Sequence, residues 1–253
     1  ASIARLNPAP AEVVVADDGS GPDTAAVIRD WQSRLPLIHV WHSDQGFRAA
    51  EARNRAVAAS QSEYLIFLDG DCLVFPDYVG RHLALAEPGR MLVGNRVLLS
   101  SELTEAVLAG RTNPLSWSAG DWWNARREGR INRLLPLLRL PGRGWRLRRP
   151  RRWQGVHTCN LGLWRRDFVA VNGFDERYQG WGHEDADLAI RLMHRGILRK
   201  DGQYGVPVLH LWHRENDRGN EAENRRRLNE VLTGSRPQRA ELGLDSHTAD
   251  QAG

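Results

Sequence analysis

The sequence predicts an α/β fold in which helices flank a doubly wound, mostly parallel sheet. Three observations support this class. Apolar strand-like runs alternate with helix-like segments between residues 12 and 68. Two of these runs end in acidic clusters, and the carboxyl ends of strands are where such sheets bind ligands. The 253 residues are 41% hydrophobic and 26% charged, so the chain can form a core.

The N-terminal half alternates strand and helix signals. Three consecutive valines, Val13 to Val15, stop in an Asp-Gly turn, as expected of a buried parallel strand that leads into a loop. The run from Tyr64 to Leu68 is the clearest strand signal and ends directly in Asp69-Gly70-Asp71. The expected strands are residues 12–16, 37–41, 64–68 and 91–100, and the expected helices are residues 23–34, 49–60 and 76–86.

The second half begins with a segment that lacks clear periodicity. Residues 111–153 lose the pattern, and Pro136 breaks an apolar run, so we expect a long loop or a small helical insertion there. Order returns with strands at residues 159–164 and 206–212 and a helix at residues 185–195. The polar tail from Ser235 onward is expected to be loose.

Composition limits the class of protein. The sequence has no run of about 18 apolar residues, which predicts no transmembrane helix, and its start shows no signal-peptide pattern. Cys72 and Cys159 are too few for a disulfide framework and fit a reducing compartment, most simply the cytoplasm.

Positive charge is concentrated in one stretch. Eleven arginines but a single acid, Glu128, lie between Arg126 and Arg152, although the net charge is only +4. Such a stretch favours an anionic partner: a phosphate-bearing substrate, a membrane surface or a nucleic acid. Tryptophans in or beside it suit stacking on sugars or anchoring at lipid headgroups. A solvated loop is the alternative interpretation.

Asp69-Gly70-Asp71 is the sharpest local feature. Two carboxylates separated by one glycine at the end of an apolar strand can converge on a hard divalent cation. The alternative is an ordinary turn with solvated acids, because Asp and Gly are common turn residues.

Two further clusters stand near the ends of later elements. In Trp181-Gly182-His183-Glu184-Asp185-Ala186-Asp187, the acids open a helix, where simple capping is the alternative explanation. Three acids and a histidine are denser than capping needs, and a carboxylate here could act as general base on a hydroxyl. His210-Leu211-Trp212-His213 closes a strand and offers two candidate metal ligands.

The motifs together resemble family 2 glycosyltransferases with the GT-A fold. They occur in that family's order, and the later ones resemble a galactosyltransferase-type half. The matching segments are residues 12–20, 45–54, 68–71, 172–176, 180–187 and 210–213. The resemblance covers about residues 10–216, with the arginine-rich stretch poorly matched, and it implies a sheet of the GT-A type.

At the nucleotide, the resemblance implies a role for each matching residue. Asp17 and Asp18 would hold the uridine of a UDP-sugar. Arg48, Arg53 and Asn54 would help to bind the nucleotide or position the Asp-Gly-Asp loop.

The resemblance also implies a divalent metal, Mn²⁺ or Mg²⁺. Asp71 would ligate it directly, and Asp69 would contact the ribose or the metal. His213 would be the third protein ligand, because it precedes a charged pair as the metal-binding histidine of related galactosyltransferases does. His210 is the alternative ligand.

The catalytic residues are expected at the second acidic cluster. The resemblance implies that Asp185 is the catalytic base and that Glu184 orients the acceptor. Trp181 and Gly182 would shape the acceptor and donor-sugar site.

These roles divide the chain into four parts. Residues 1–110 would form the nucleotide-sugar-binding half, and residues 111–155 an arginine- and tryptophan-rich insertion. Residues 156–234 would form the acceptor-binding and catalytic half, followed by the loose tail of residues 235–253.

One departure from the family pattern concerns the sheet. The family begins with a strand that ends near Pro-x-Tyr-Asn, whereas residues 1–6 resemble the end of the helix that follows it. The family's first strand is therefore expected to be absent, so either the chain is incomplete or the sheet is rearranged. Its absence would leave two unpaired edges and remove part of the nucleotide pocket.

The expected activity is an inverting, metal-dependent transfer of a hexose or N-acetylhexosamine from a UDP-sugar to a glycan hydroxyl. Bacterial surface polysaccharide or lipopolysaccharide assembly is the expected setting. The acceptor would be a glycan or lipid-linked glycan, and the arginine-rich stretch would allow peripheral contact with an anionic membrane at its cytoplasmic face. No nucleic-acid partner is expected.

Three other functions are compatible with parts of the sequence. A phosphatase of the haloacid dehalogenase type also has Asp-x-Asp after an apolar strand, but Leu73 stands where that family has Thr or Val. The arginine stretch could bind nucleic acid, although the acidic clusters oppose this at the strand ends. A transferase that binds sugars without turnover is the third alternative.

Overall fold

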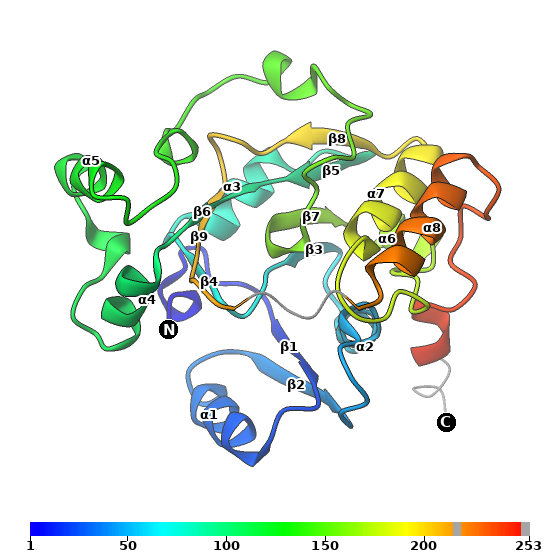
Figure 1. The fold of residues 1–253 in the computed structure, drawn as a ribbon, viewed down its shortest axis with the longest axis horizontal. Coiled ribbons are helices and arrows are strands. Elements are labelled where there is room, and N and C mark those ends of the chain that lie inside the picture. Colours follow the sequence, from blue (N-terminus) through cyan, green and yellow to red (C-terminus); the bar gives the residue numbers. More distant parts are fainter. Residues whose placement is uncertain (215–218, 249–253) are drawn as a thin grey trace.

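The computed structural model describes residues 1–214 and 219–248, which form an α/β structure (Figure 1). Its strands are β1 (Val13–Asp18), β2 (Leu37–His42), β3 (Tyr64–Phe67), β4 (Cys72–Val74), β5 (Arg90–Val93), β6 (Asn95–Leu98), β7 (Leu161–Trp164), β8 (Leu198–Asp201) and β9 (Pro207–His210). Its helices are α1 (Pro22–Gln32), α2 (Ala49–Ala59), α3 (Tyr78–Leu85), α4 (Ser101–Leu108), α5 (Ala119–Arg127), α6 (Arg165–Ala170), α7 (Glu184–His194) and α8 (Glu221–Leu232). Every helix in the described ranges is too short or too polar to cross a bilayer.

The strands form three sheets. β1 and β2 make a parallel pair, and β3-β7-β5-β8 and β4-β9-β6 make a four-stranded and a three-stranded sheet. The predicted α/β class is confirmed, but the sheets are mixed, not mostly parallel. Within the described residues, three strand pairs are parallel and three are antiparallel. Short apolar strands buried on both faces look alike in either direction, which is why the sequence did not show this.

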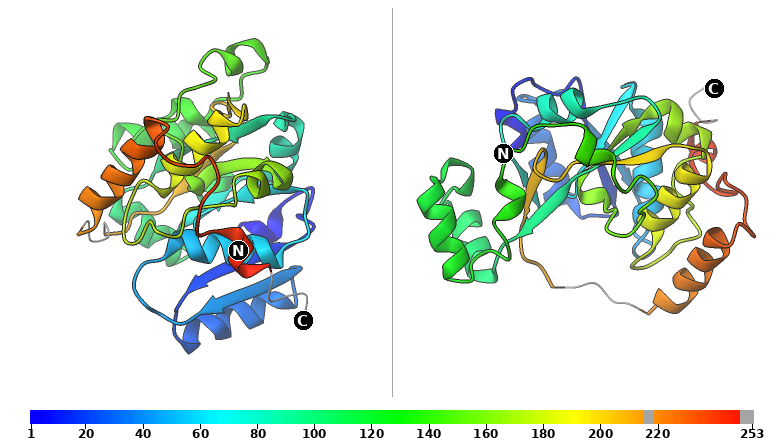
Figure 2. Two further views of the ribbon diagram at one scale, coloured as in Figure 1. Left: turned by 90° about the vertical axis from the view of Figure 1, so that its right-hand side faces the viewer. Right: turned by 90° about the horizontal axis from the view of Figure 1, so that it is seen from above.

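The parallel pair β1–β2 stands apart from the other two sheets. Figures 1 and 2 show β1, β2 and α1 as a layer at one end of the molecule, joined to the rest through α2. Among the described strands, β1 pairs with β2 alone and β3 with β7 alone. The β1–β2 pair is therefore a separate two-stranded sheet and not part of the four-stranded one.

The expected strand at residues 91–100 is divided at Gly94. β5 pairs with β8 in the four-stranded sheet, whereas β6 pairs with β9 in the three-stranded sheet. A Cβ at residue 94 would lie 2.2 Å from the Asn160 side chain, so only glycine fits this crossing. The Asp69-Gly70-Asp71 loop makes a second connection, between β3 and β4. Both connections bring the two sheets together beside the acidic loop.

The main core lies between the four-stranded sheet and α2, α6 and α7. Phe168 and Phe174 are fully buried, and their rings lie 5.5 Å apart. Phe67 packs on both rings at the same centroid distance. This aromatic cluster, reinforced by aliphatic residues of α2 and α7, fixes α7 against the end of β3.

The arginine- and tryptophan-rich segment is a small helical insertion, which was one of the two predicted alternatives. It contains α5 and short 3₁₀ turns at Leu135–Leu137 and Gly144–Leu147. Trp117 and Trp122 pack edge to face at 4.9 Å, and Ala125 and Ile131 join a buried cluster with β6. Figures 1 and 2 show α5 at the opposite end of the molecule from α8.

The expectation of a loose tail is wrong for residues 235–248. Ala240 and Leu244 are buried, and their N–H groups donate to the carbonyls of Val171 and Asn172 at 3.0 and 3.1 Å. These two apolar side chains anchor an otherwise polar segment, which is why its composition misled the prediction. Residues 249–253 lie outside the described ranges.

Candidate active site

Three segments that are distant in sequence meet at Arg53. Its guanidinium, from α2, lies 3.1 Å from Glu184 and 3.7 Å from Asp185 at the start of α7. The other guanidinium nitrogen lies 3.3 Å from Asp69, directly after β3. The ring of Phe174 lies under the guanidinium at 5.5 Å. The two acidic clusters that the sequence singled out are therefore parts of one site.

Burial and like charges shift the titration of this cluster. Burial alone would lower the pKa of Arg53, but the carboxylates of Asp185 and Glu184 raise it, so the guanidinium stays charged. Burial and the nearby Asp185 raise the pKa of Glu184 to about 7. Burial also raises the pKa of Asp69. Perturbed acids in one cluster are typical of functional sites.

Asp185 is held at both carboxylate oxygens by Thr158. The Thr158 hydroxyl donates to Oδ1 at 2.8 Å, and the Thr158 backbone N–H donates to Oδ2 at 3.1 Å. Thr158 is buried. Sequence reasoning missed this residue, because it stands in a short 3₁₀ turn with no motif around it. Two donors leave Asp185 in one orientation, as a base aimed at a substrate hydroxyl must be.

Asp71 faces two histidines at the end of β9: His210 is the last residue of this strand, and His213 lies three residues further on. Its Oδ2 lies 3.4 Å from Nε2 of His210 and 3.1 Å from Nε2 of His213. The two imidazole rings lie 5.3 Å apart. Donor atoms of Asp71, Cys72 and His210 also lie within 4.8 Å of one another. The structure thus brings both histidines that the sequence proposed, the preferred one and the alternative, to the same carboxylate.

The hydrogen bonds of these histidines fit a cation at Asp71. Nδ1 of His210 donates to the carbonyl of Leu211 at 2.9 Å, and Nδ1 of His213 donates to that of Arg214 at 2.8 Å. A carbonyl oxygen only accepts, so Nδ1 carries the proton in both rings. In the neutral rings, the Nε2 lone pairs then face a carboxylate oxygen, an arrangement that a divalent cation would stabilise. One carboxylate and two imidazoles can together bind a divalent metal cation.

Asp17 and Asp18 end β1 in a tight, hydrogen-bonded turn. Asp17 is buried and accepts from the Ser20 N–H at 2.8 Å, and its other oxygen lies 2.7 Å from Nε2 of His39. Burial alone would raise the pKa of Asp17, but these hydrogen bonds lower it, so this acid is ionised. Asp18 accepts from the backbone N–H of Arg48 at 2.6 Å, which ties the turn to the loop before α2.

Asn54 does not reach the surface of this site. Its amide donates to the Phe174 carbonyl at 2.9 Å and to Glu176 at 2.7 Å, and its oxygen accepts from the Phe174 N–H at 2.9 Å. Because Asn54 is fully buried and its polar atoms already have partners, it has no group to offer a nucleotide. These bonds match neither of its two expected roles, nucleotide binding or positioning of the Asp-Gly-Asp loop: Asn54 instead fixes the loop that carries Phe174 beneath Arg53.

Trp181 and Gly182 lie in the loop that leads into α7. Gly182 and His183 have φ angles of +102° and +77°, so the chain turns sharply before Glu184. A Cβ at residue 182 would meet open space, so the backbone faces outward there. The N–H of Gly180 donates to the carbonyl of Phe47 at 2.9 Å. This bond places the loop beside the segment that carries Arg48.

The chain belongs to glycosyl transferase family 2. The model of that family matches residues 1–149, and the model described as the N-terminal domain of galactosyltransferase matches residues 145–201. Both the family and the galactosyltransferase-type half expected from the motifs are therefore confirmed. This membership removes the phosphatase alternative as a description of the chain.

Curated relatives agree with this family, and a solved structure shares the fold. The chain is 32% identical to validoxylamine A glucosyltransferase of Streptomyces hygroscopicus subsp. limoneus, over 78% of this chain and 44% of that protein. It is 26% identical to the hyaluronan synthase of Pasteurella multocida, over 76% of this chain and 20% of the synthase. The chain thus spans less than half the length of either relative. The structure of S. aureus TarS residues 1–349 in complex with UDP shares the fold, with 12% identity, a TM-score of 0.59, and coverage of 97% of this chain and 62% of that one.

Proposed function

We propose that this chain transfers a hexose or N-acetylhexosamine from a UDP-sugar to a hydroxyl of a glycan acceptor, with inversion of the anomeric carbon. The observation that carries the proposal is the convergence of Asp69, Glu184 and Asp185 on Arg53. Asp185, the proposed base, therefore lies beside the loop that carries Asp71, the proposed metal ligand, which supports this assignment. A nucleotide-sugar reaction needs both at one site.

The diphosphate end of the donor is assigned to Asp71 and its histidines. Asp71, His213 and His210 would hold Mn²⁺ or Mg²⁺, with Asp69 turned towards the ribose or the metal. The cation would supply positive charge to the departing diphosphate. The TarS structure was obtained with UDP, which supports a uridine nucleotide as the leaving group here.

The nucleotide is assigned to the turn after β1 and the loop before α2. Asp17 and Asp18 would accept from the uracil and ribose, and Arg48 would close the pocket. Arg53 would hold Asp69 and α7 in place. Trp181 and Gly182 would lie against the sugars, because the indole offers a flat stacking face and the glycine leaves room.

The proton transfer is assigned to Asp185. Its carboxylate would take the proton from the acceptor hydroxyl while that oxygen attacks the anomeric carbon and the bond to the diphosphate breaks. A single displacement of this kind inverts the configuration. Glu184, whose pKa is raised to about 7, would donate or accept a hydrogen bond to orient the acceptor.

The setting we propose is polysaccharide assembly at a bacterial surface, which the similarity to a hyaluronan synthase supports.

Peripheral membrane contact is a second element of the proposal. Leu108, Trp123 and Leu135 are 71, 65 and 60% exposed, and each stands within three residues in the sequence of an exposed arginine of the insertion. Co-sedimentation with vesicles of anionic and neutral lipid tests this contact, and a lack of salt-sensitive binding to the anionic vesicles would exclude it.

The activity is tested by UDP release from a panel of UDP-sugars with Mn²⁺ and then with EDTA. We expect release from one donor, and its abolition by EDTA. If no donor releases UDP, UDP binding in Mn²⁺ separates the explanations. Tight binding would mean that the assay lacks the acceptor, whereas absence of binding would contradict a donor site in this chain.

A further inference from the structure

A cavity of about 400 Å³ lies between the insertion and the ends of β6 and β8. Four arginines line it, whereas it has a single carboxylate: the arginines are Arg96, Arg133, Arg152 and Arg199, and the carboxylate is Asp201. The cavity is therefore strongly positive, and it is concave, which suits a compact anionic group better than a flat surface.

The guanidinium groups of this cavity have few acidic partners. Arg133 donates to the backbone carbonyl of Arg96 at 2.7 Å, and Arg96 approaches the sulfur of Cys159 at 3.9 Å. Arg199 donates to the carbonyls of Arg152 and Gln154, and its nearest carboxylate, Asp201, is 3.8 Å away. Within residues 1–214 and 219–248, Arg96, Arg133 and Arg152 form no ion pair with a carboxylate. These charges are available to a ligand.

The electrostatics of the wall agree with an excess of positive charge. Burial lowers the pKa of Arg199, Asp201 opposes this shift, and the neighbouring Arg152 and Arg149 add to it. Burial and the charge of Arg96 lower the pKa of His157, so the ring adds no charge of its own at neutral pH.

The cavity adjoins the candidate base. His157 lines the cavity, and the next residue, Thr158, holds both oxygens of Asp185. A ligand in the cavity would therefore lie beside the group assigned to deprotonate the acceptor, which makes the acceptor the natural occupant.

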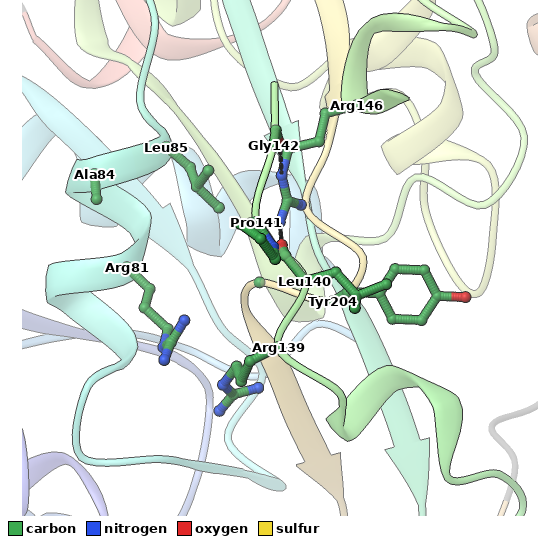
Figure 3. Close-up of a pocket in the computed structure, with 10 residues that line it drawn as sticks. Arg81, Ala84, Leu85, Arg139, Leu140, Pro141, Gly142, Arg146 and Tyr204 are labelled. Carbon is green, nitrogen blue, oxygen red and sulfur yellow. Dashed lines mark hydrogen bonds between the residues drawn. The ribbon is translucent and has the colours of Figure 1, made fainter. Parts of the chain in front are cut away.

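A second cavity, of about 300 Å³, provides a contrast (Figure 3). Arg81 and Arg139 point towards each other there, but both contact Asp77. Arg146 donates all its bonds to backbone carbonyls, including that of Leu140 at 2.9 Å. Arg81 and Arg139 thus share a carboxylate and Arg146 is buried, whereas Arg133 and Arg152 of the first cavity are exposed and have no carboxylate partner among the described residues.

We propose that the arginine-lined cavity binds the phosphate groups of the acceptor, so that the acceptor substrate is a phosphate-bearing glycan carrier, and a diphosphate in particular. This inference rests on the proposed function. The planar guanidinium group of arginine can donate two parallel hydrogen bonds to two phosphate oxygens. Several arginines without a carboxylate partner offer more hydrogen-bond donors than one sugar carboxylate could accept.

The direct test is calorimetric titration with inorganic pyrophosphate in EDTA, a condition that removes metal-dependent binding at Asp71. We expect binding that weakens with added salt and that falls at least tenfold in Arg152→Gln and in Arg133→Gln. Both side chains are exposed, so these variants should fold. Arg143→Gln is the matched control, because Arg143 is an exposed insertion arginine paired with Glu87 outside the cavity, and it should bind as wild type does.

Further arms identify the source of the phosphate and separate this inference from the proposed function. Farnesyl diphosphate in detergent that binds more tightly than pyrophosphate would indicate a lipid-linked acceptor, and equal binding would indicate a soluble one. Three results would overturn the inference: no binding of pyrophosphate, equal binding of pyrophosphate by all variants, or binding of glucuronate instead of pyrophosphate. Loss of Mn²⁺-dependent UDP binding in Arg152→Gln would also overturn it, because the cavity would then belong to the donor site.

Discussion

The hydroxyl of Thr158 donates to Oδ1 of Asp185 at 2.8 Å, while its backbone N–H donates to Oδ2 at 3.1 Å. A carboxylate held in this way keeps one orientation through the reaction. The pair thus connects a residue that no sequence motif marks to the group assigned as the base, and it makes the base assignment open to test without altering Asp185.

Thr158→Val removes the hydroxyl but keeps the backbone donor and nearly the same shape. Because Asp185 would then rotate more freely, we expect turnover to fall by about tenfold to a hundredfold while UDP affinity stays unchanged. Steady-state kinetics and UDP calorimetry measure the two effects. Thr233→Val, at the end of α8, serves as a control. Unchanged turnover in Thr158→Val would show that this contact does not position the base.

Arg53→Met removes the cation that Asp69, Glu184 and Asp185 share. The Arg53 side chain is only 18% exposed, so its loss leaves three carboxylates close together without compensation. We expect the free energy of unfolding at neutral pH to fall by about 3–5 kcal/mol. Urea denaturation measures this change. Arg55→Met, on the same helix with a more exposed ion pair to Glu51, should change it by less than about 1 kcal/mol. Equal effects of both variants would refute the buried network.

Glu184→Gln tests the raised pKa of Glu184. The folded protein binds this proton up to a pKa of about 7, whereas the unfolded chain releases it near the ordinary value of 4.5. Glu184 therefore favours folding at acidic pH, and this contribution is lost as pH rises from about 4.5 to 7. Wild type should lose up to about 3 kcal/mol relative to Glu184→Gln over this range. Urea denaturation at pH 4.5, 6 and 7.5 measures the difference, and parallel pH profiles would contradict it.

The metal assignment predicts that both histidines matter. His213→Gln and His210→Gln should each weaken Mn²⁺-dependent UDP binding by at least about tenfold, and Asp71→Asn should abolish it. His194→Gln, an exposed histidine at the end of α7, should bind normally. If only one of the two histidine variants lost binding, the other ring would be structural. Wild-type binding by Asp71→Asn would exclude this metal site.

The sequence identified the parts of the site whose chemistry is local. Asp71 and Asp185 stand in dense motifs at the ends of apolar segments, where turn and cap positions are easily recognised. Their partners come from distant segments. Nothing around Thr158 indicates that it contacts α7. Asn54 resembles a ligand-binding residue, although it is buried and holds the Phe174 loop in place.

The fold was predictable to a similar degree. The periodic helices α1 and α2 and the strand β3 lie close to their predicted positions. The pairing of short strands was not predictable, because direction and sheet membership depend on tertiary contacts such as Asn160 against Gly94. The helices α4, α6 and α8 were not predicted, because α4 and α6 have only 8 and 6 residues and α8 has few apolar residues to show a helical period.

The most direct test of the central claim is Asp185→Asn, which keeps the size and shape of the side chain but removes the base; its amide oxygen can still accept one of the two hydrogen bonds from Thr158. UDP release with Mn²⁺ is measured beside UDP affinity, with Asp23→Asn as an exposed first-turn control on α1. We predict that release falls by about a hundredfold or more while UDP affinity stays within twofold of wild type, and that the control behaves normally. Release from Asp185→Asn near the wild-type rate would contradict the account, because Asp185 would then be a capping residue and the base would lie elsewhere.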